Sequence, residues 1–131
     1  MRVLVVGASG LIGSAVAAHL TADQHEVVGI SRHPPEAGLG TVQHVAFDLA
    51  ASTPENFLPL LAGVDAIVNC AGTLQDAPGD STAGVHHKGV ASLVAACEKM
   101  GVRRFIHLSA IGVDRETTSF SASKHMLVKR L

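Results

Sequence analysis

The sequence has no tryptophan and no tyrosine, and phenylalanine occurs only four times. Hydrophobic residues nevertheless make up 47% of the 131 residues, so the core must be built from Val, Ile, Leu and Ala. A chain of this length corresponds to one domain, which we expect to span residues 1–131.

Charge of either sign is also scarce, with 10 basic and 11 acidic residues. Because there is no dense basic run, we do not expect nucleic acid as a partner. No apolar stretch approaches the roughly 18 residues of a transmembrane helix, which argues against a membrane protein. The first predicted strand begins at residue 3, which leaves no room for a signal peptide.

Cysteine occurs twice, as Cys70 and Cys97, in apolar segments without the spacing of a CxxC motif. This usage predicts two buried free thiols in the reducing cytoplasm. The eight histidines do not predict a metal site, because six are scattered and the adjacent pair His86-His87 would point about 100° apart on a helix.

The most informative stretch runs from Val3 to Gly13, where an apolar run is followed by three glycines at GxxGxxG spacing. Gly7 suits a tight turn, Gly10 allows a pyrophosphate to approach the backbone, and Gly13 allows close packing of helix on strand. The N-terminus of the following helix offers free N–H groups to phosphates. The alternative is a structural glycine turn that binds nothing.

Strand and helix patterns alternate through the rest of the chain. This alternation predicts an α/β fold, a doubly wound parallel sheet of about five strands. In the helix that begins at Leu11, three apolar residues recur on one face: Ile12, Val16 and Leu20. The expected strands are 3–6, 26–30, 42–47, 65–69 and 104–109, and the expected helices are 11–20, 54–61, 83–100 and 121 to the end, with loops at 34–40, 73–81 and 112–119.

Ligands of such sheets bind beyond the carboxyl ends of the strands. The second strand ends at Ser31-Arg32, where an acidic residue would be expected to hold the ribose of NAD. Because a guanidinium pairs with a 2′-phosphate, this pair favours NADP over NAD. The alternative is a solvated surface arginine.

Two further strand ends carry candidate cofactor residues. Asp48, which precedes Leu49 after the third strand, is suited to accept a hydrogen bond from an adenine amino group, unless it only caps a turn. Ala71 and Gly72 follow the fourth strand and are small enough for a ribose to lie against the backbone. Here the alternative is a tight strand end without a ligand.

Taken together, these motifs resemble the N-terminal part of a short-chain dehydrogenase/reductase, in the extended or atypical branch with the NAD-dependent epimerase/dehydratase and NmrA-like groups. The resemblance implies a Rossmann fold that binds NAD(P). The matching segments are 7–13, 48–49, 69–72, 101–112 and 121–125. The implied cofactor residues are Gly7, Ser9, Gly10, Leu11, Ile12, Gly13, Ser31, Arg32, Asp48, Leu49, Ala71, Gly72 and Lys124.

The catalytic residues that the resemblance implies are only partly present. Lys124 matches the family lysine, but the position of the family tyrosine falls on Phe120, which cannot transfer a proton. The family serine falls on Ala110, although a shift of one residue would bring in Ser109. The family asparagine falls on His86, and His107 is expected to be a core residue.

The family fold continues beyond the helix that carries Lys124, and the later part supplies the substrate region. We therefore expect the fifth strand to be an exposed edge or to be covered in a homo-oligomer. Three functions remain open: an NADP-binding oxidoreductase or epimerase/dehydratase domain with weak turnover, a non-catalytic NADP-sensing or assembly module, and the cofactor half of a longer enzyme. A flavin is less expected, because no residues mark its pocket.

Overall fold

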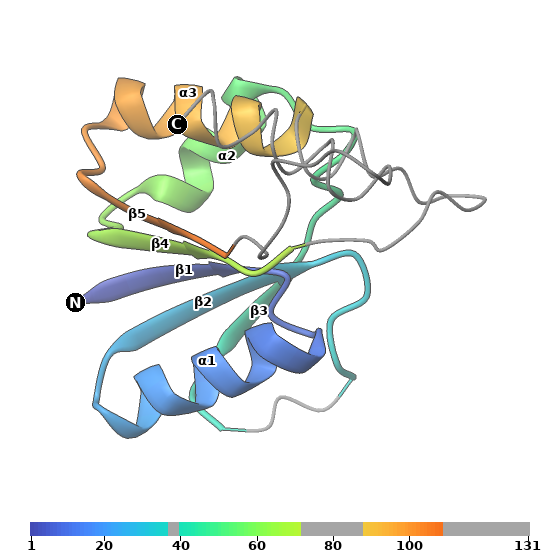
Figure 1. Cartoon of the computed structure of the whole chain (residues 1–131), viewed down its shortest axis with the longest axis vertical. Helices are drawn as coiled ribbons and strands as arrows, with labels where there is room; N and C mark the ends of the chain where they lie inside the picture. The colour runs from blue at the N-terminus through green and yellow to red at the C-terminus, as the bar shows by residue number, and fades with distance from the viewer. Residues whose placement is uncertain (37–39, 72–87, 109–131) are drawn as a thin grey trace, which may run out of the picture.

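The computed structural model describes residues 1–36, 40–71 and 88–108 (Figure 1). Several predicted features lie outside these residues: Gly72, the loops 73–81 and 112–119, the start of helix 83–100 with His86, Ser109, Ala110, and the last helix with Phe120 and Lys124. The elements are β1 (Arg2–Val6), α1 (Leu11–Ala22), β2 (Glu26–Ser31), β3 (Gln43–Ala46), α2 (Pro54–Leu61), β4 (Ala66–Asn69), α3 (Val90–Met100) and β5 (Arg104–His107).

The strands form one five-stranded sheet in the order β3-β2-β1-β4-β5, and all neighbouring pairs are parallel. β1 lies in the middle, and the chain moves to one side of it for β2 and β3 and to the other side for β4 and β5. This reversal is the switch point of a doubly wound sheet. The predicted Rossmann-type fold is therefore confirmed.

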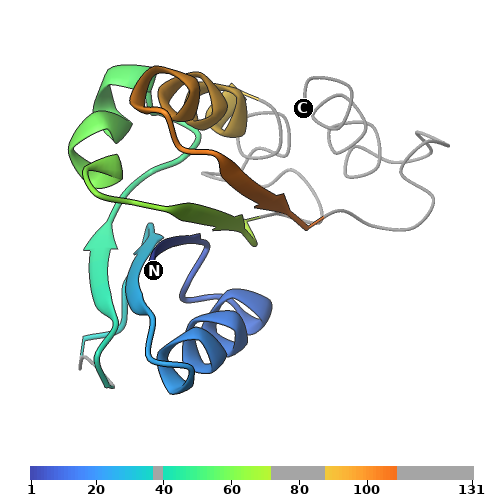
Figure 2. The ribbon, with the colours of Figure 1, turned by 90° about the vertical axis from the view of Figure 1, so that its left-hand side faces the viewer.

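Helices cover both faces of the sheet, with α1 on one face and α2 and α3 on the other (Figures 1 and 2). The alternating residues of β1 enter two separate cores, since Leu4 and Val6 pack beneath α2 and α3 while Val3 and Val5 pack beneath α1. All four side chains are at most 2% exposed. This two-sided burial explains why the strand shows no alternation of polar and apolar residues.

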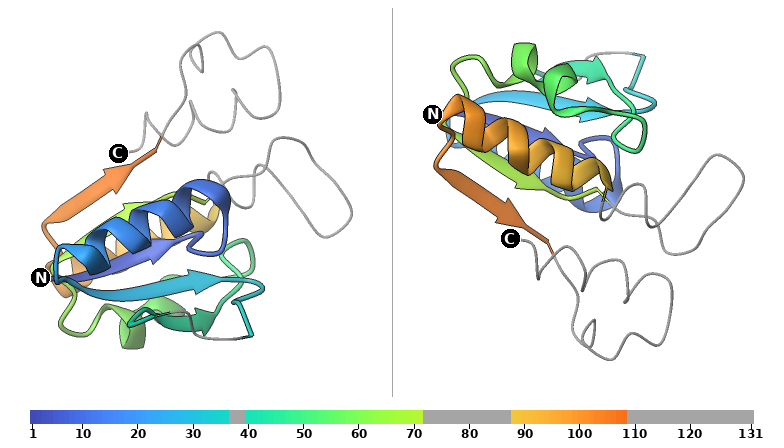
Figure 3. Two further views of the ribbon diagram at one scale, coloured as in Figure 1. Left: turned by 90° about the horizontal axis from the view of Figure 1, so that it is seen from below. Right: turned by 90° about the horizontal axis from the view of Figure 1, so that it is seen from above.

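Helix α1 runs along β1 (Figure 3, left), but its inner face differs from the expected one. Its fully buried residues are Gly13 and Ala17, whereas Ile12 is 52% exposed. Val16 and Leu20 are half-buried beside the core. Ile12, Val16 and Leu20 thus lie beside the contact between α1 and the sheet rather than in it. Gly13 and Ala17 form the contact, because their small size allows the helix to lie close to the sheet.

The predicted ends of the other elements agree to within a few residues. Thr53 occupies the N-cap position of α2, and its backbone N–H donates to Asn56 Oδ1 at 2.8 Å. Gly101 ends α3 in the left-handed region at φ 73°, with Val102 N donating to Cys97 O at 3.0 Å. Strand β3 is shorter than expected, at 43–46 rather than 42–47, and β5 as described ends at His107.

Strand β5 is the edge of the described sheet rather than a buried strand (Figure 3, right). Ile106 on this strand is 55% exposed, and His107 is only half-buried. The expectation that His107 is a core residue is therefore wrong, since within the described sheet its strand pairs only with β4.

Among the described residues, no helix combines the length and the apolar character that a membrane span requires. Within 1–36, 40–71 and 88–108, no three His, Cys, Asp or Glu side chains come together as a metal site would require.

Candidate dinucleotide-binding site

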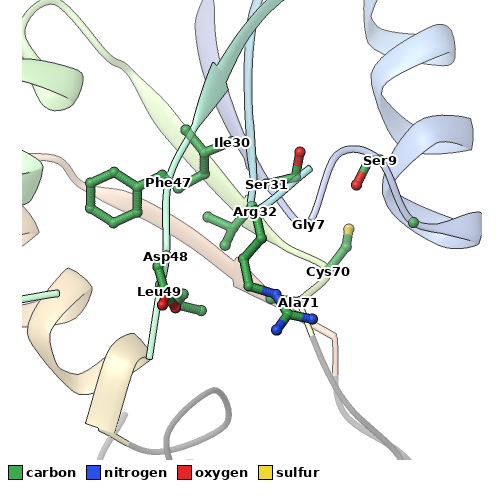
Figure 4. A pocket seen from close by; sticks show the side chains of 12 residues that line it. Gly7, Ser9, Ile30, Ser31, Arg32, Phe47, Asp48, Leu49, Cys70 and Ala71 are labelled. Carbon is green, nitrogen blue, oxygen red and sulfur yellow. The ribbon is translucent and has the colours of Figure 1, made fainter. Parts of the chain in front are cut away.

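A pocket of about 260 Å³ opens at the carboxyl ends of the strands, at the switch point (Figure 4). The ends of β1, β2, β3 and β4 all contribute to it, as expected from the fold. The lining residues are Val6, Gly7, Ser9, Gly10, Ile30, Ser31, Arg32, Phe47, Asp48, Leu49, Cys70 and Ala71.

The turn between β1 and α1 forms one wall, and its backbone conformation requires glycine. Gly7 has φ +77°, and its N–H and that of Ala8 both donate to Ile30 O, at 2.9 and 3.2 Å. A Cβ on Gly7 would lie 2.9 Å from the backbone of Ala71. A Cβ on Gly13 would overlap the carbonyl oxygen of Gly7. The first and third glycines therefore have the roles that their spacing predicted.

The N-terminus of α1 follows this turn directly. Its N-cap residue is Gly10, which has no side chain to accept hydrogen bonds from the first N–H groups of the helix. No acidic residue lies in the first turn, so the positive end of the helix dipole is not neutralised locally. These groups at the pocket suit an anionic ligand such as a diphosphate.

Ser31 and Arg32 bring a hydroxyl and a cation to the pocket from the end of β2. Ser31 is only 9% exposed, and its hydroxyl hydrogen-bonds to no atom in the part of the chain that the structure describes. The exposed Arg32 side chain extends toward the side of the pocket that Ala71 lines (Figure 4). The two side chains extend in different directions from the end of β2 (Figure 4), and each provides hydrogen-bond donors for a charged oxygen group.

Asp48 lies on the pocket wall and also shapes the turn after β3. Its Oδ1 accepts a hydrogen bond from the backbone N–H of Ala50 at 3.1 Å. The turn-capping role that the sequence left open is therefore present. The second carboxylate oxygen provides an acceptor at the pocket, so the two roles do not exclude each other.

Cys70 and Ala71 form the wall at the end of β4. The Cys70 backbone N–H donates to Val6 O at 2.9 Å, which holds this segment against β1. Cys70 is half-buried, so the expectation of two buried thiols is correct only for Cys97, which is 4% exposed. Burial, with a smaller effect of the Glu98 charge, raises the pKa of the Cys97 thiol to about 11.

Most of the predicted cofactor residues within the described ranges come together at this pocket. Leu11, Ile12 and Gly13 do not line it, because Leu11 and Ile12 point outward and Gly13 contacts Gly7. Gly72, Lys124 and Ser109 lie outside the described residues. The residues that sequence reasoning missed are Val6, Ile30, Phe47 and Cys70. The first three are the last residues of predicted strands, and Cys70 directly follows one, which was the available signal.

Solved structures share this fold and match 98% of the chain. The oxidoreductase ylbE from Lactococcus lactis matches with a TM-score of 0.80 and 28% identity, covering 98% of this chain and 61% of that one. A short-chain dehydrogenase/reductase superfamily protein from Agrobacterium tumefaciens, with bound NAD, matches with a TM-score of 0.85. It is 23% identical over 98% of this chain and 43% of its own, so it supports the fold alone.

Characterised and uncharacterised relatives are similar in sequence. A 2-alkyl-3-oxoalkanoate reductase from Stenotrophomonas maltophilia is 32% identical over 121 residues, which is 90% of this chain and 36% of the reductase. An uncharacterised protein of Mycobacterium tuberculosis is 37% identical over 71 residues, 54% of this chain and 8% of that protein. This chain thus spans only a part of these relatives.

One protein family, described as NAD(P)H-binding, matches residues 7–130. This range begins at the glycine turn, directly after β1 ends at Val6, and it includes the ends of β2, β3 and β4. Since the match covers nearly the whole chain, and since the sheet has the order and switch point of a dinucleotide-binding fold, this protein belongs to the NAD(P)H-binding family, as its resemblance to the short-chain dehydrogenases/reductases predicted.

Proposed function

We propose that this chain is a cytoplasmic NADP(H)-binding domain, and that Arg32 and Ser31 select NADP over NAD. The observation that carries the proposal is the meeting of the glycine turn, Ser31, Arg32 and Asp48 in one pocket at the switch point. The glycine turn and the start of α1 would hold the diphosphate. Asp48 would accept from the adenine amino group, and Ala71 and Gly72 would lie beside a ribose.

The preference for NADP rests on charge at the end of β2. The 2′-phosphate carries the negative charge that distinguishes NADP from NAD, and Arg32 supplies a cation for it. The hydroxyl of Ser31, buried without a partner among the described residues, supports the same assignment. Loss of a hydrogen bond to a charged group weakens binding by roughly 10- to 100-fold.

Replacement of Arg32 tests this assignment. We expect Arg32→Ala to weaken NADPH binding by roughly 10- to 100-fold and to change NADH binding little. The matched control is Arg103→Ala, which removes an exposed arginine at the opposite end of the sheet, just before β5. If Arg32→Ala weakened both cofactors equally, or neither, the NADP preference would be wrong.

The cofactor chemistry implied by this fold is hydride transfer, which also requires a group that exchanges a proton with the substrate. The chain contains no tyrosine, and Phe120 stands at the family position. We therefore propose that this chain alone turns over slowly or not at all, with Lys124 holding the cofactor ribose and Ser109 as the remaining candidate to polarise a substrate oxygen.

The missing tyrosine favours a second candidate, a non-catalytic module that senses NADP or takes part in an assembly, including a homo-oligomer. A third candidate is the cofactor half of a longer enzyme, since the chain spans 36% of the Stenotrophomonas reductase. The discriminating experiment mixes the chain with NADPH and a 2-alkyl-3-oxoalkanoate. Binding without NADPH oxidation supports the module or the cofactor half of a longer enzyme, whereas oxidation that Lys124→Ala abolishes supports catalysis by this chain.

A further inference from the structure

A hydrogen-bonded pair joins the pocket wall to the edge strand of the sheet. Asn69 is the last residue of β4 and pairs in register with His107, the last residue of β5. The Asn69 side chain is 0% exposed and bonded at both ends. Its Oδ1 accepts from the backbone N–H of Ala71 at 3.2 Å, and its Nδ2 lies 2.9 Å from His107 Nδ1.

These two bonds determine which nitrogen of His107 carries the proton. The Ala71 N–H is a donor, so the side-chain atom of Asn69 that faces it must be the oxygen. The amide nitrogen then faces His107 and can only donate. His107 Nδ1 must therefore be an unprotonated acceptor, with the ring proton on Nε2.

The same side chain fixes the wall of the pocket. Cys70 and Ala71 directly follow Asn69 and both line the pocket. The backbone of Ala71 packs against Gly7, where even a Cβ would approach to 2.9 Å. The contacts therefore run without a break from His107 through Asn69 and Ala71 to Gly7, the first residue of the glycine turn.

We propose that Asn69 and His107 are positioning residues of the dinucleotide site, which hold the Cys70–Ala71 wall in the shape that receives the ribose of the nicotinamide half. This inference rests on the proposed cofactor function. A doubly wound sheet binds a dinucleotide with its two halves on either side of the switch point. Arg32 and Asp48 lie on the β2–β3 side, whereas the Asn69 and His107 pair lies on the β4–β5 side.

Two probes separate the halves of the site. Adenosine 2′,5′-bisphosphate carries the adenine, the 2′-phosphate and the adjacent 5′-phosphate of NADP but no nicotinamide ribose, so its binding reports on the β2–β3 side and the glycine turn and not on the ribose beside the Cys70–Ala71 wall. We expect His107→Leu, which removes the acceptor, to weaken NADPH binding about tenfold and to leave bisphosphate binding unchanged. His107→Asn places an amide oxygen close to the position of Nδ1 and should restore NADPH binding.

The pair of probes also distinguishes this inference from the proposed function. If the wild-type chain bound neither probe, the cofactor function itself would be wrong. If the wild type bound both probes, and His107→Leu weakened the binding of both equally or of neither, the positioning role would be overturned.

The folded wild type gives an independent test by nitrogen NMR of the histidine rings, with His107→Asn as the assignment control. A proton on Nε2 supports the pair, and a proton on Nδ1 overturns it.

Discussion

A Cβ on Gly13 would overlap the carbonyl oxygen of Gly7, so residue 13 fits against the turn only without a side chain. The contact places the first turn of α1 directly against the end of β1. In consequence, the N-cap residue of the helix, Gly10, lies at the same pocket as the strand ends. A side chain at residue 13 must move the helix.

The first prediction concerns this contact. We expect Gly13→Ala to lower the free energy of unfolding by about 1–3 kcal/mol, because the obstructing atom belongs to the backbone and cannot rotate away. Urea denaturation measures the change. Ala15→Ser, on the exposed face of the same helix, should change stability by no more than about 0.5 kcal/mol. Equal stability of Gly13→Ala and wild type would contradict the close packing.

The second prediction separates the two roles of Asp48. In Asp48→Asn the amide oxygen can still accept from Ala50 N–H, so we expect unchanged stability. The other side-chain position becomes an NH₂ donor, which faces the adenine amino group unfavourably. NADPH binding should therefore weaken about tenfold, whereas Asp48→Ala should lose both stability and binding. Calorimetric titration measures the NADPH affinity of each variant, and thermal unfolding measures its stability. If Asp48→Asn bound NADPH as tightly as the wild type, the proposed role of Asp48 in binding adenine would be wrong.

The third prediction uses the difference between the two thiols. Cys70 is half-buried on the pocket wall, and we expect iodoacetamide to modify it near neutral pH. Cys97 should remain unmodified, because burial raises the pKa of its thiol to about 11 and blocks access. NADPH should slow the modification of Cys70, as peptide mass spectrometry can show. Equal rates with and without saturating NADPH would place the cofactor elsewhere.

The fourth prediction follows from the pKa of Cys97. Burial raises the pKa of the Cys97 thiol in the folded protein to about 11, whereas the unfolded chain releases this proton near the ordinary thiol pKa of 9.0. Between these pH values the unfolded state binds fewer protons, so stability should fall as the pH rises. Urea midpoints of wild type and Cys97→Ala, compared from pH 8 to about 11, measure this. The wild type should lose more stability than the variant, and parallel curves would contradict the shift.

The elements and the glycine turn could be predicted from the sequence because they depend on local patterns. The inner face of α1 could not, since the spacing of Ile12, Val16 and Leu20 shows which residues share a face but not how close the helix lies. The exposure of β5 depends on its place in the strand order. The bond between Asn69 and His107 joins residues 38 positions apart and requires the register of two strands.

The central claim is that the pocket at the switch point binds a nicotinamide dinucleotide. The most direct test is a titration of the chain with NADPH and with NADH, followed by nicotinamide fluorescence. The absence of Trp and Tyr keeps the protein background small. We predict saturable binding of NADPH that is tighter than that of NADH. Failure of both cofactors to bind at millimolar concentration would contradict the account.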